Sequence, residues 1–183
     1  MKKLLCLALV FGVCQCAEAQ KKYFTKTGIL SFEASTPLET INPVNKSATS
    51  VVDITTGQIE FAVLIKGFEF DKALMQEHFN ENYMESSKYP KSVFKGTITN
   101  LQSIHFSKDG TYPATVKGYL EIHGVKKEIT VTGAITISGT TIKSVAQFNV
   151  LISDYNISIP GIVRDKISKT ATVKVNCTYA PLK

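Results

Sequence analysis

The sequence has no tryptophan, three histidines and four cysteines. Three of the cysteines lie within the first 16 residues, so Cys177 is the only thiol in the rest of the chain. A single thiol cannot form an internal disulfide. The fold must therefore be stabilised by its hydrophobic core, and a chain of 183 residues is long enough to bury one.

Long apolar runs are also lacking, apart from Leu4–Val13, which is too short to cross a bilayer. This run follows Lys2-Lys3 and precedes Ala17-Glu18-Ala19, an order typical of a cleaved signal peptide. We therefore predict a signal peptide over 1–19 and a single mature domain over 20–183 that is periplasmic or secreted. A lipoprotein acylated at Cys14 is the alternative, although Phe11-Gly12-Val13 fits the required small residues poorly.

Arginine is almost absent, since Arg164 is the only one, and basic residues exceed acidic ones by six. After signal-peptide cleavage the net charge is about +5. Such an excess favours acidic surfaces or anionic headgroups, but it lacks the clustered charge of a nucleic-acid-binding protein. We expect no nucleic-acid partner.

Catalytic signatures are missing as well. The chain has no Gly-x-Ser-x-Gly, no His-Glu-x-x-His and no glycine-rich phosphate loop. His78, His105 and His123 have no metal-ligand spacing, and nothing near Cys177 would activate its thiol. We predict a protein without catalytic activity, metal or cofactor, in which Cys177 is buried.

What the chain does contain is alternation of apolar and polar residues, which is typical of half-buried β-strands. The pattern is strongest over 115–123, 128–137, 141–150 and 171–179, weaker over 27–36, 58–69 and 92–100, and weakest over 47–56. Turn residues such as His123-Gly124 and Ser138-Gly139 separate neighbouring strands. We therefore predict an all-β fold, an eight-stranded antiparallel barrel.

One segment, at about 71–85, has a helical pattern instead. Asp71 is its expected N-cap, and Tyr89-Pro90 ends it before the next strand. A single amphipathic helix can cap one end of a barrel. We expect His78 near that end and interpret His123 as a residue that forms hydrogen bonds within its own turn.

The predicted inward faces mix large side chains with glycines such as Gly96, Gly118 and Gly133. Small residues cannot fill their share of an interior, and the four clearest strands place no charged residue on that face. The pattern is compatible with a cavity for a long apolar ligand. A packed core, with twist and taper accommodating the glycines, is equally compatible.

Three blocks carry a resemblance to a known family: "HFNENYMESSKYPKSVFKGTI" (78–98), "GYLEIHGVKKEITV" (118–131) and "FNVLISDYNISIPGIVRDKIS" (148–168). In this order they resemble the YceI-like proteins. The resemblance implies an exported, lipocalin-like barrel that binds a polyisoprenoid or similar amphiphilic lipid without catalysis. The short polar region 36–50 departs from the family pattern at the expected entrance of the barrel.

From the resemblance and the strand faces we predict a set of ligand-contacting residues. The predicted cavity lining is Phe32, Phe61, Val63, Met75, Phe79, Tyr83, Phe94, Val116, Leu120, Val131, Ile135, Phe148 and Val173. The headgroup candidates are Arg164, Lys166 and Lys126, because basic side chains bind phosphate or carboxylate groups.

Two other functions remain open at this point. The chain could be a protein-interaction or structural barrel with a packed core, or a redox accessory that holds a quinone. The sequence also leaves open the identity of the lipid, transient contact with a membrane, and pairing into homodimers.

Overall fold

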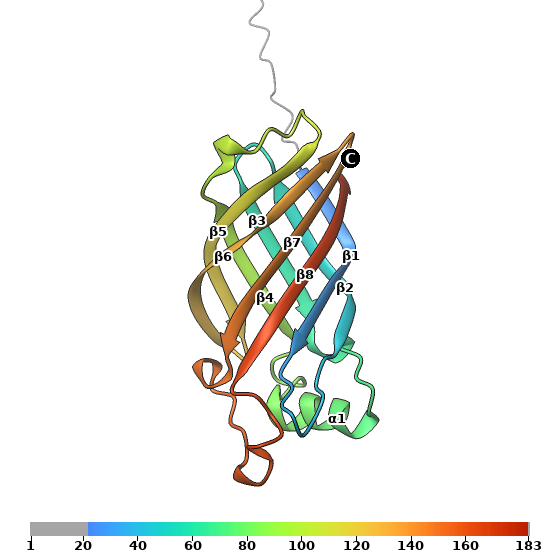
Figure 1. Cartoon of the computed structure of the whole chain (residues 1–183), viewed down its shortest axis with the longest axis vertical. Coiled ribbons are helices and arrows are strands. Elements are labelled where there is room, and N and C mark those ends of the chain that lie inside the picture. The colour runs from blue at the N-terminus through green and yellow to red at the C-terminus, as the bar shows by residue number, and fades with distance from the viewer. Residues whose placement is uncertain (1–21, 183) are drawn as a thin grey trace, which may run out of the picture.

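The structure, a computed structural model, describes residues 22–182, which form an antiparallel barrel of eight strands (Figure 1). Each strand pairs with its sequence neighbours, and β8 pairs with β1 to close the barrel. The predicted signal peptide lies outside the described residues. The strands are β1 (Lys22–Glu33), β2 (Val44–Asp53), β3 (Gln58–Leu64), β4 (Lys91–Ile98), β5 (Gly110–Ile122), β6 (Val125–Ser138), β7 (Thr141–Leu151) and β8 (Thr170–Pro181).

The prediction of an eight-stranded antiparallel barrel is confirmed, including the turns between its longest strands. His123 and Gly124 both have positive φ, 51° and 73°, and Ile122 pairs directly with Val125. Positive φ at both central residues is the requirement of a two-residue hairpin turn that follows the twist of the sheet. This turn brings His123 to the end of the barrel that carries the helix.

One end of the barrel is filled by side chains. The connection 99–109, which contains a 3₁₀ turn (η3, Leu101–Ser103), folds over this end between β4 and β5. Its Ile104 packs with Ile98, Ala114 and Ile137 in a fully buried apolar cluster. Residues 101–109 thus close the end of the barrel opposite the helix (Figure 1).

The other end is covered by a helix and two loops (Figure 1). Helix α1 (Ala73–His78) continues into a π-helical turn, η2 (Phe79–Tyr83), after a 3₁₀ turn, η1 (Ile65–Gly67). The loops are 34–43 and 152–169, and the second contains the 3₁₀ turns η4 (Ile152–Tyr155) and η5 (Gly161–Val163). None of the helices between residues 22 and 182 combines the length and apolar composition needed to cross a bilayer.

The predicted N-cap of the helix was wrong. Lys72 occupies this position and makes no capping hydrogen bond with its side chain, while Asp71 lies one residue earlier. Instead, the side-chain Oε1 of Gln76 accepts a hydrogen bond from the backbone N–H of Phe70, at 3.2 Å. A side chain within the helix therefore anchors the segment that leads into it.

Aromatic packing fixes the helical segment to the sheet. The Phe79 ring lies 5.5 Å from that of Phe32 on β1, 5.6 Å from Phe68 and 5.0 Å from Phe70, measured between centroids. Such pairs add about 0.5–1.5 kcal/mol each beyond the burial of their surface. The four rings form an aromatic cluster at the helix end of the barrel.

His123 joins the covering segments to the barrel. Its Nε2 lies 2.8 Å from Glu85 Oε2, at the end of the helical segment, and its Nδ1 lies 3.1 Å from the backbone oxygen of Tyr155 in η4. The Tyr89 ring packs edge-on against it, with centroids 4.5 Å apart. The interpretation of His123 as bonded within its own turn was wrong, because the turn directs the ring toward two other segments.

The glycines of β4 and β5 do not open the space that the sequence suggested. Gly96 and Gly118 pair across the two strands, and a Cβ on Gly118 would overlap the Lys95 carbonyl oxygen and the Gly96 Cα. A Cβ on Gly96 would lie 2.7 Å from the Phe94 ring. These glycines permit close approach of two strands and leave no void.

We predict that Gly118→Ala destabilises the barrel by about 1–3 kcal/mol, because the added methyl group must displace backbone atoms of β4. The matched control is Gly161→Ala, where an added Cβ meets nothing within 4 Å. Urea unfolding of both variants checks the difference. Equal stability of the two variants would contradict the close-approach explanation.

Candidate functional site: an apolar cavity inside the barrel

The interior of the barrel holds a cavity of about 560 Å³. Its lining comes from every strand except β2, from the helical segment and from both loops at the helix end. The volume falls within the usual range of ligand sites, which is about 300–1,000 Å³. The interior of this barrel is therefore not packed throughout.

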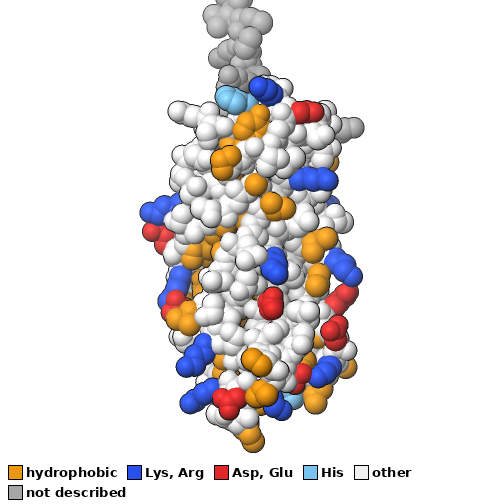
Figure 2. Space-filling model, in the orientation of Figure 1, with side chains coloured by type: hydrophobic (Ala, Val, Ile, Leu, Met, Phe, Trp, Pro, Cys, Tyr) orange, Lys and Arg blue, Asp and Glu red, His pale blue; other side chains and the backbone are white. Residues whose placement is uncertain are grey.

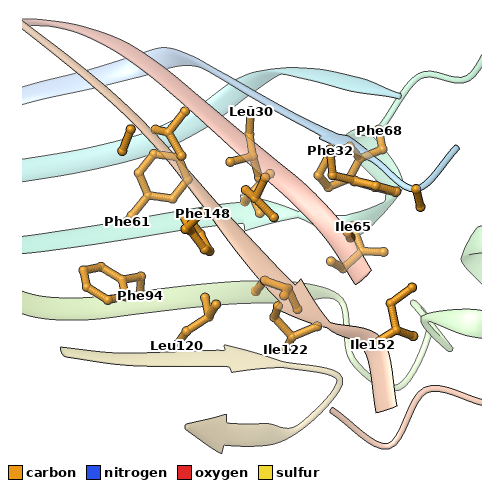
Figure 3. A pocket seen from close by; sticks show the side chains of 18 of the residues that line it. Leu30, Phe32, Phe61, Ile65, Phe68, Phe94, Leu120, Ile122, Phe148 and Ile152 are labelled. Atoms are coloured by element: carbon orange, nitrogen blue, oxygen red, sulfur yellow. The ribbon is translucent and has the colours of Figure 1, made fainter. Parts of the chain in front are cut away.

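Large apolar side chains line the cavity along its length (Figure 3). Phe61, Phe94 and Phe148 lie in the left half of the view, and Phe32 and Phe68 lie at its upper right. Phe61, Phe94 and Phe148 lie on β3, β4 and β7, whose polar residues alternate with them and face solvent. The walls offer surface for a flexible apolar chain.

All thirteen residues predicted as cavity lining do line this cavity. Their contact with a lipid stays a prediction. The predicted set did not include the loop residues that also line the cavity. These are Ile41 from loop 34–43, and Ile157, Ile159, Val163 and Ile167 from loop 152–169. Loop residues follow no period, and the available signal was only the density of apolar residues in "ISIPGIVRDKI".

Among residues 22–182, the acidic and basic side chains that line the cavity all lie at its helix end, which we call the mouth. They are Glu39, Lys72, His78 and Lys166, all from α1, its flanks or the two loops. Lys72 Nζ donates a hydrogen bond to Glu39 Oε1 at 2.7 Å. This hydrogen bond lowers the pKa of Glu39 from its ordinary value, and the nearby charge of Lys166 acts in the same direction. The mouth thus holds more positive than negative charge.

The three headgroup candidates have different positions. Lys166 lines the mouth, whereas Arg164 is exposed in the same loop and does not contribute to the lining. Lys126 lies on the outer face of β6, with Nζ 4.7 Å from the centroid of the Tyr119 ring. Alternation along β6 explains this, because the inward positions Ile129 and Val131 force residue 126 outward. Of the three, only Lys166 is positioned to meet a ligand in the cavity.

The sequence matches the YceI-like domain family over residues 24–179. The chain belongs to the YceI-like family. Comparison with curated protein sequences found no match.

Solved structures share the fold at low sequence identity. A polyisoprenoid-binding domain from Saccharophagus degradans, implicated in plant cell wall breakdown, superposes with a TM-score of 0.77 at 14% identity, covering 88% of this chain and 98% of that one. BcnA of Burkholderia cenocepacia gives 0.68 at 16% identity, covering 84% and 96%. A Campylobacter jejuni YceI protein gives 0.51 at 14% identity, covering 100% and 92%.

In this YceI-like chain the deep end of the cavity carries hydroxyl groups. Ser50 Oγ donates to the Glu60 carbonyl oxygen at 2.9 Å, so it accepts from the Tyr179 hydroxyl at 3.0 Å. Ser144 Oγ donates in turn to the Tyr179 oxygen at 3.3 Å. Burial raises the pKa of Tyr179 far above its ordinary value. Ser144 and Tyr179 both line the cavity, so its deep end is neutral and polar.

Cys177 is fully buried beside this group and does not line the cavity. Its Sγ lies 2.7 Å from where a Cβ on Gly28 would be, so the thiol fills the space next to β1. Burial raises its pKa to about 11. Within residues 22–182 no group of three or more His, Cys, Asp or Glu side chains could hold a metal ion.

The raised pKa of Cys177 predicts instability at alkaline pH. In the folded protein the pKa of the thiol is about 11, compared with an ordinary value of 9.0, so the folded thiol stays protonated to higher pH. Its contribution to stability is thus fully present below pH 9 and is lost as the pH rises toward 11. Between pH 8 and 10 we expect the parent to lose about 1 kcal/mol more than Cys177→Ala in urea unfolding. Parallel pH profiles would show that burial does not suppress ionisation of this thiol.

Proposed function

We propose that this YceI-like chain is a non-catalytic carrier or store that holds one amphiphilic lipid, with a polyisoprenoid-like chain inside the barrel. The observation that carries the proposal is the polarity of the cavity. Its walls are apolar along their length, and its charged residues are confined to the mouth. An amphiphile with an apolar chain and a polar headgroup matches this distribution in one orientation.

Burial of the chain would supply the affinity. Each methylene group removed from water contributes about 0.8 kcal/mol. Ten such groups give about 8 kcal/mol, which corresponds to a Kd of about 1 µM before the costs of ordering the ligand. The long apolar cavity therefore favours long chains over short ones.

The mouth supports an anionic headgroup. Lys72 and Lys166 both flank the single carboxylate of Glu39. A phosphate or carboxylate bound beside Lys166 would meet the charge that Glu39 leaves uncompensated. The fold shared with the polyisoprenoid-binding domain of Saccharophagus degradans supports the choice of an isoprenoid chain.

Export is part of the proposal. The predicted signal peptide over 1–19 would deliver the protein to the periplasm or beyond, where a lipid must cross water between membranes. The mass of the protein isolated from that compartment tests this directly. A chain beginning at Gln20 is expected, and a mature chain that retains residues 1–19 would contradict export by cleavage.

A quinone is the second candidate ligand, and one observation favours it. The hydroxyl groups of Ser144 and Tyr179 line the deep end of the cavity. Ser144 Oγ could donate to a quinone carbonyl oxygen if its hydroxyl turned from the Tyr179 oxygen, to which it donates at 3.3 Å. The ultraviolet absorbance of an organic extract distinguishes a quinone from a simple isoprenoid. The packed-core interaction module has no such support, because a cavity of about 560 Å³ lies where its core would be.

Mass spectrometry of an organic extract from the purified mature protein is the test. We expect about one lipid per chain in the parent, and at least a tenfold loss in Ala146→Phe, because residue 146 lines the cavity and a phenyl ring there would occupy the ligand's space. The ring enters existing space, so the variant should fold.

Gln147→Phe is the matched control, since residue 147 is exposed on the same strand. It should retain the full lipid content. An empty parent that also takes up no fluorescent fatty acid, or equal lipid content in the two Phe variants, would overturn the proposed function.

A further inference from the structure

Large aliphatic side chains are exposed at the mouth, where they contribute little to the packing of the barrel. Ile162 is 93% exposed, Leu38 68% and Leu74 62%, and they come from loop 152–169, loop 34–43 and α1. Leu74 itself lines the mouth, while Leu38 and Ile162 adjoin the lining residues Glu39 and Val163. Exposed apolar side chains are ordinary when scattered, but three segments converging on one opening indicate an interaction surface.

Ile162 is the most exposed of the three. It sits in η5, within the loop between β7 and β8 that extends beyond α1 at the lower end of the molecule (Figure 1). A Cβ on the preceding residue, Gly161, would meet nothing within 4 Å. The tip of this loop is open on its outer side, so the side chain of Ile162 contributes little to packing.

Basic residues lie on the C-terminal side of this tip, the last of them at the base of the loop beside β8. Arg164, Lys166 and Lys169 follow Ile162 in the loop, and Asp165 is the only acidic residue among them. None of the three takes part in a salt bridge within the described residues. Figure 2 shows hydrophobic side chains at the lower end of the molecule, with several basic and a few acidic side chains beside them. Apolar side chains flanked by free cations match the surface of an anionic bilayer.

Two acidic residues determine the orientation in which this surface would face an anionic bilayer. Glu77 in α1 and Glu81 in η2 are both exposed, and they carry no basic partner among the described residues. They would be repelled by anionic headgroups, whereas the loop tip would be attracted. The molecule would therefore dock with η5 deepest and with Glu77 and Glu81 turned away from the headgroups.

We propose that the mouth docks on an anionic lipid bilayer, with Ile162 inserted among the acyl chains and Arg164 and Lys169 on the headgroups. Docking in this orientation directs the cavity toward the membrane. An apolar chain could then pass between bilayer and barrel with little exposure to water, which is the step that its hydrophobicity opposes. This purpose rests on the proposed lipid ligand, whereas docking itself is measured without it.

Sedimentation with vesicles tests the docking. The probe is a 7:3 mixture of phosphatidylcholine and phosphatidylglycerol, compared with phosphatidylcholine alone, using the mature protein. We expect binding to the anionic vesicles that weakens as salt is added. Ile162→Ser should weaken it about tenfold. Arg164→Gln with Lys169→Gln should weaken it more than tenfold, since each charge near such a surface is worth about fivefold.

Matched controls lie on the barrel wall. Ile29→Ser removes an isoleucine that is 42% exposed on β1, and Lys143→Gln removes an exposed cation on β7. Both should bind vesicles like the parent. The lipid content of the loop variants should stay unchanged, because Ile162, Arg164 and Lys169 do not line the cavity.

Three results would overturn the docking proposal: no binding of the parent to anionic vesicles, equal binding to neutral ones, or an equal loss in Ile29→Ser and Ile162→Ser. A dimer that Ile162→Ser disperses, without vesicle binding, would assign the surface to a second copy of the chain instead. Vesicle binding by a protein that contains no lipid and takes up no fluorescent fatty acid would refute the proposed function and leave the docking intact.

Discussion

The pairing of β8 with β1 is the contact on which the rest of the structure depends. It closes the sheet, leaves no strand edge exposed, and turns one face of every strand toward an enclosed interior. The apolar cavity exists only because the wall around that interior is continuous. Without these backbone hydrogen bonds, the same inward faces would form an exposed apolar surface.

The two ends of the barrel are closed by different means, and this difference gives the cavity its direction. At the deep end, Ile104 and its neighbours fill the barrel, and Tyr179 bonds to Ser50 within the wall. At the mouth, the cover is a short helix and two loops, held by the aromatic cluster around Phe79 and by the hydrogen bonds of His123. A ligand is expected to enter at the mouth, because local segments held by few contacts open more readily than a continuous ladder.

Most of the fold and of the cavity lining could be predicted from the sequence, because apolar residues at every second position mark the inward face of a strand. Phe61, Val131 and Val173 could be assigned this way. What depends on spatial neighbours could not be read from one strand. Strand register decides that a Cβ on Gly118 would overlap β4. The paths of the loops decide the partners of His123 and bring Ile41 and Ile167 to the cavity. Alternation along β6, extended back from Ile129 to residue 126, indicates that Lys126 faces outward, whereas no pattern in the sequence places Lys166 at the mouth.

The most direct test of the account is methyl NMR of the mature protein during titration with a long-chain isoprenyl phosphate. The account predicts shifts at the cavity methyl groups of Leu120, Val131 and Val173, and none at Ile29 and Val51 on the outer wall. Saturation at one ligand per chain would place a single apolar chain inside the barrel. Unchanged cavity methyl groups, or shifts confined to the outer wall, would contradict the claim that the barrel interior is the binding site.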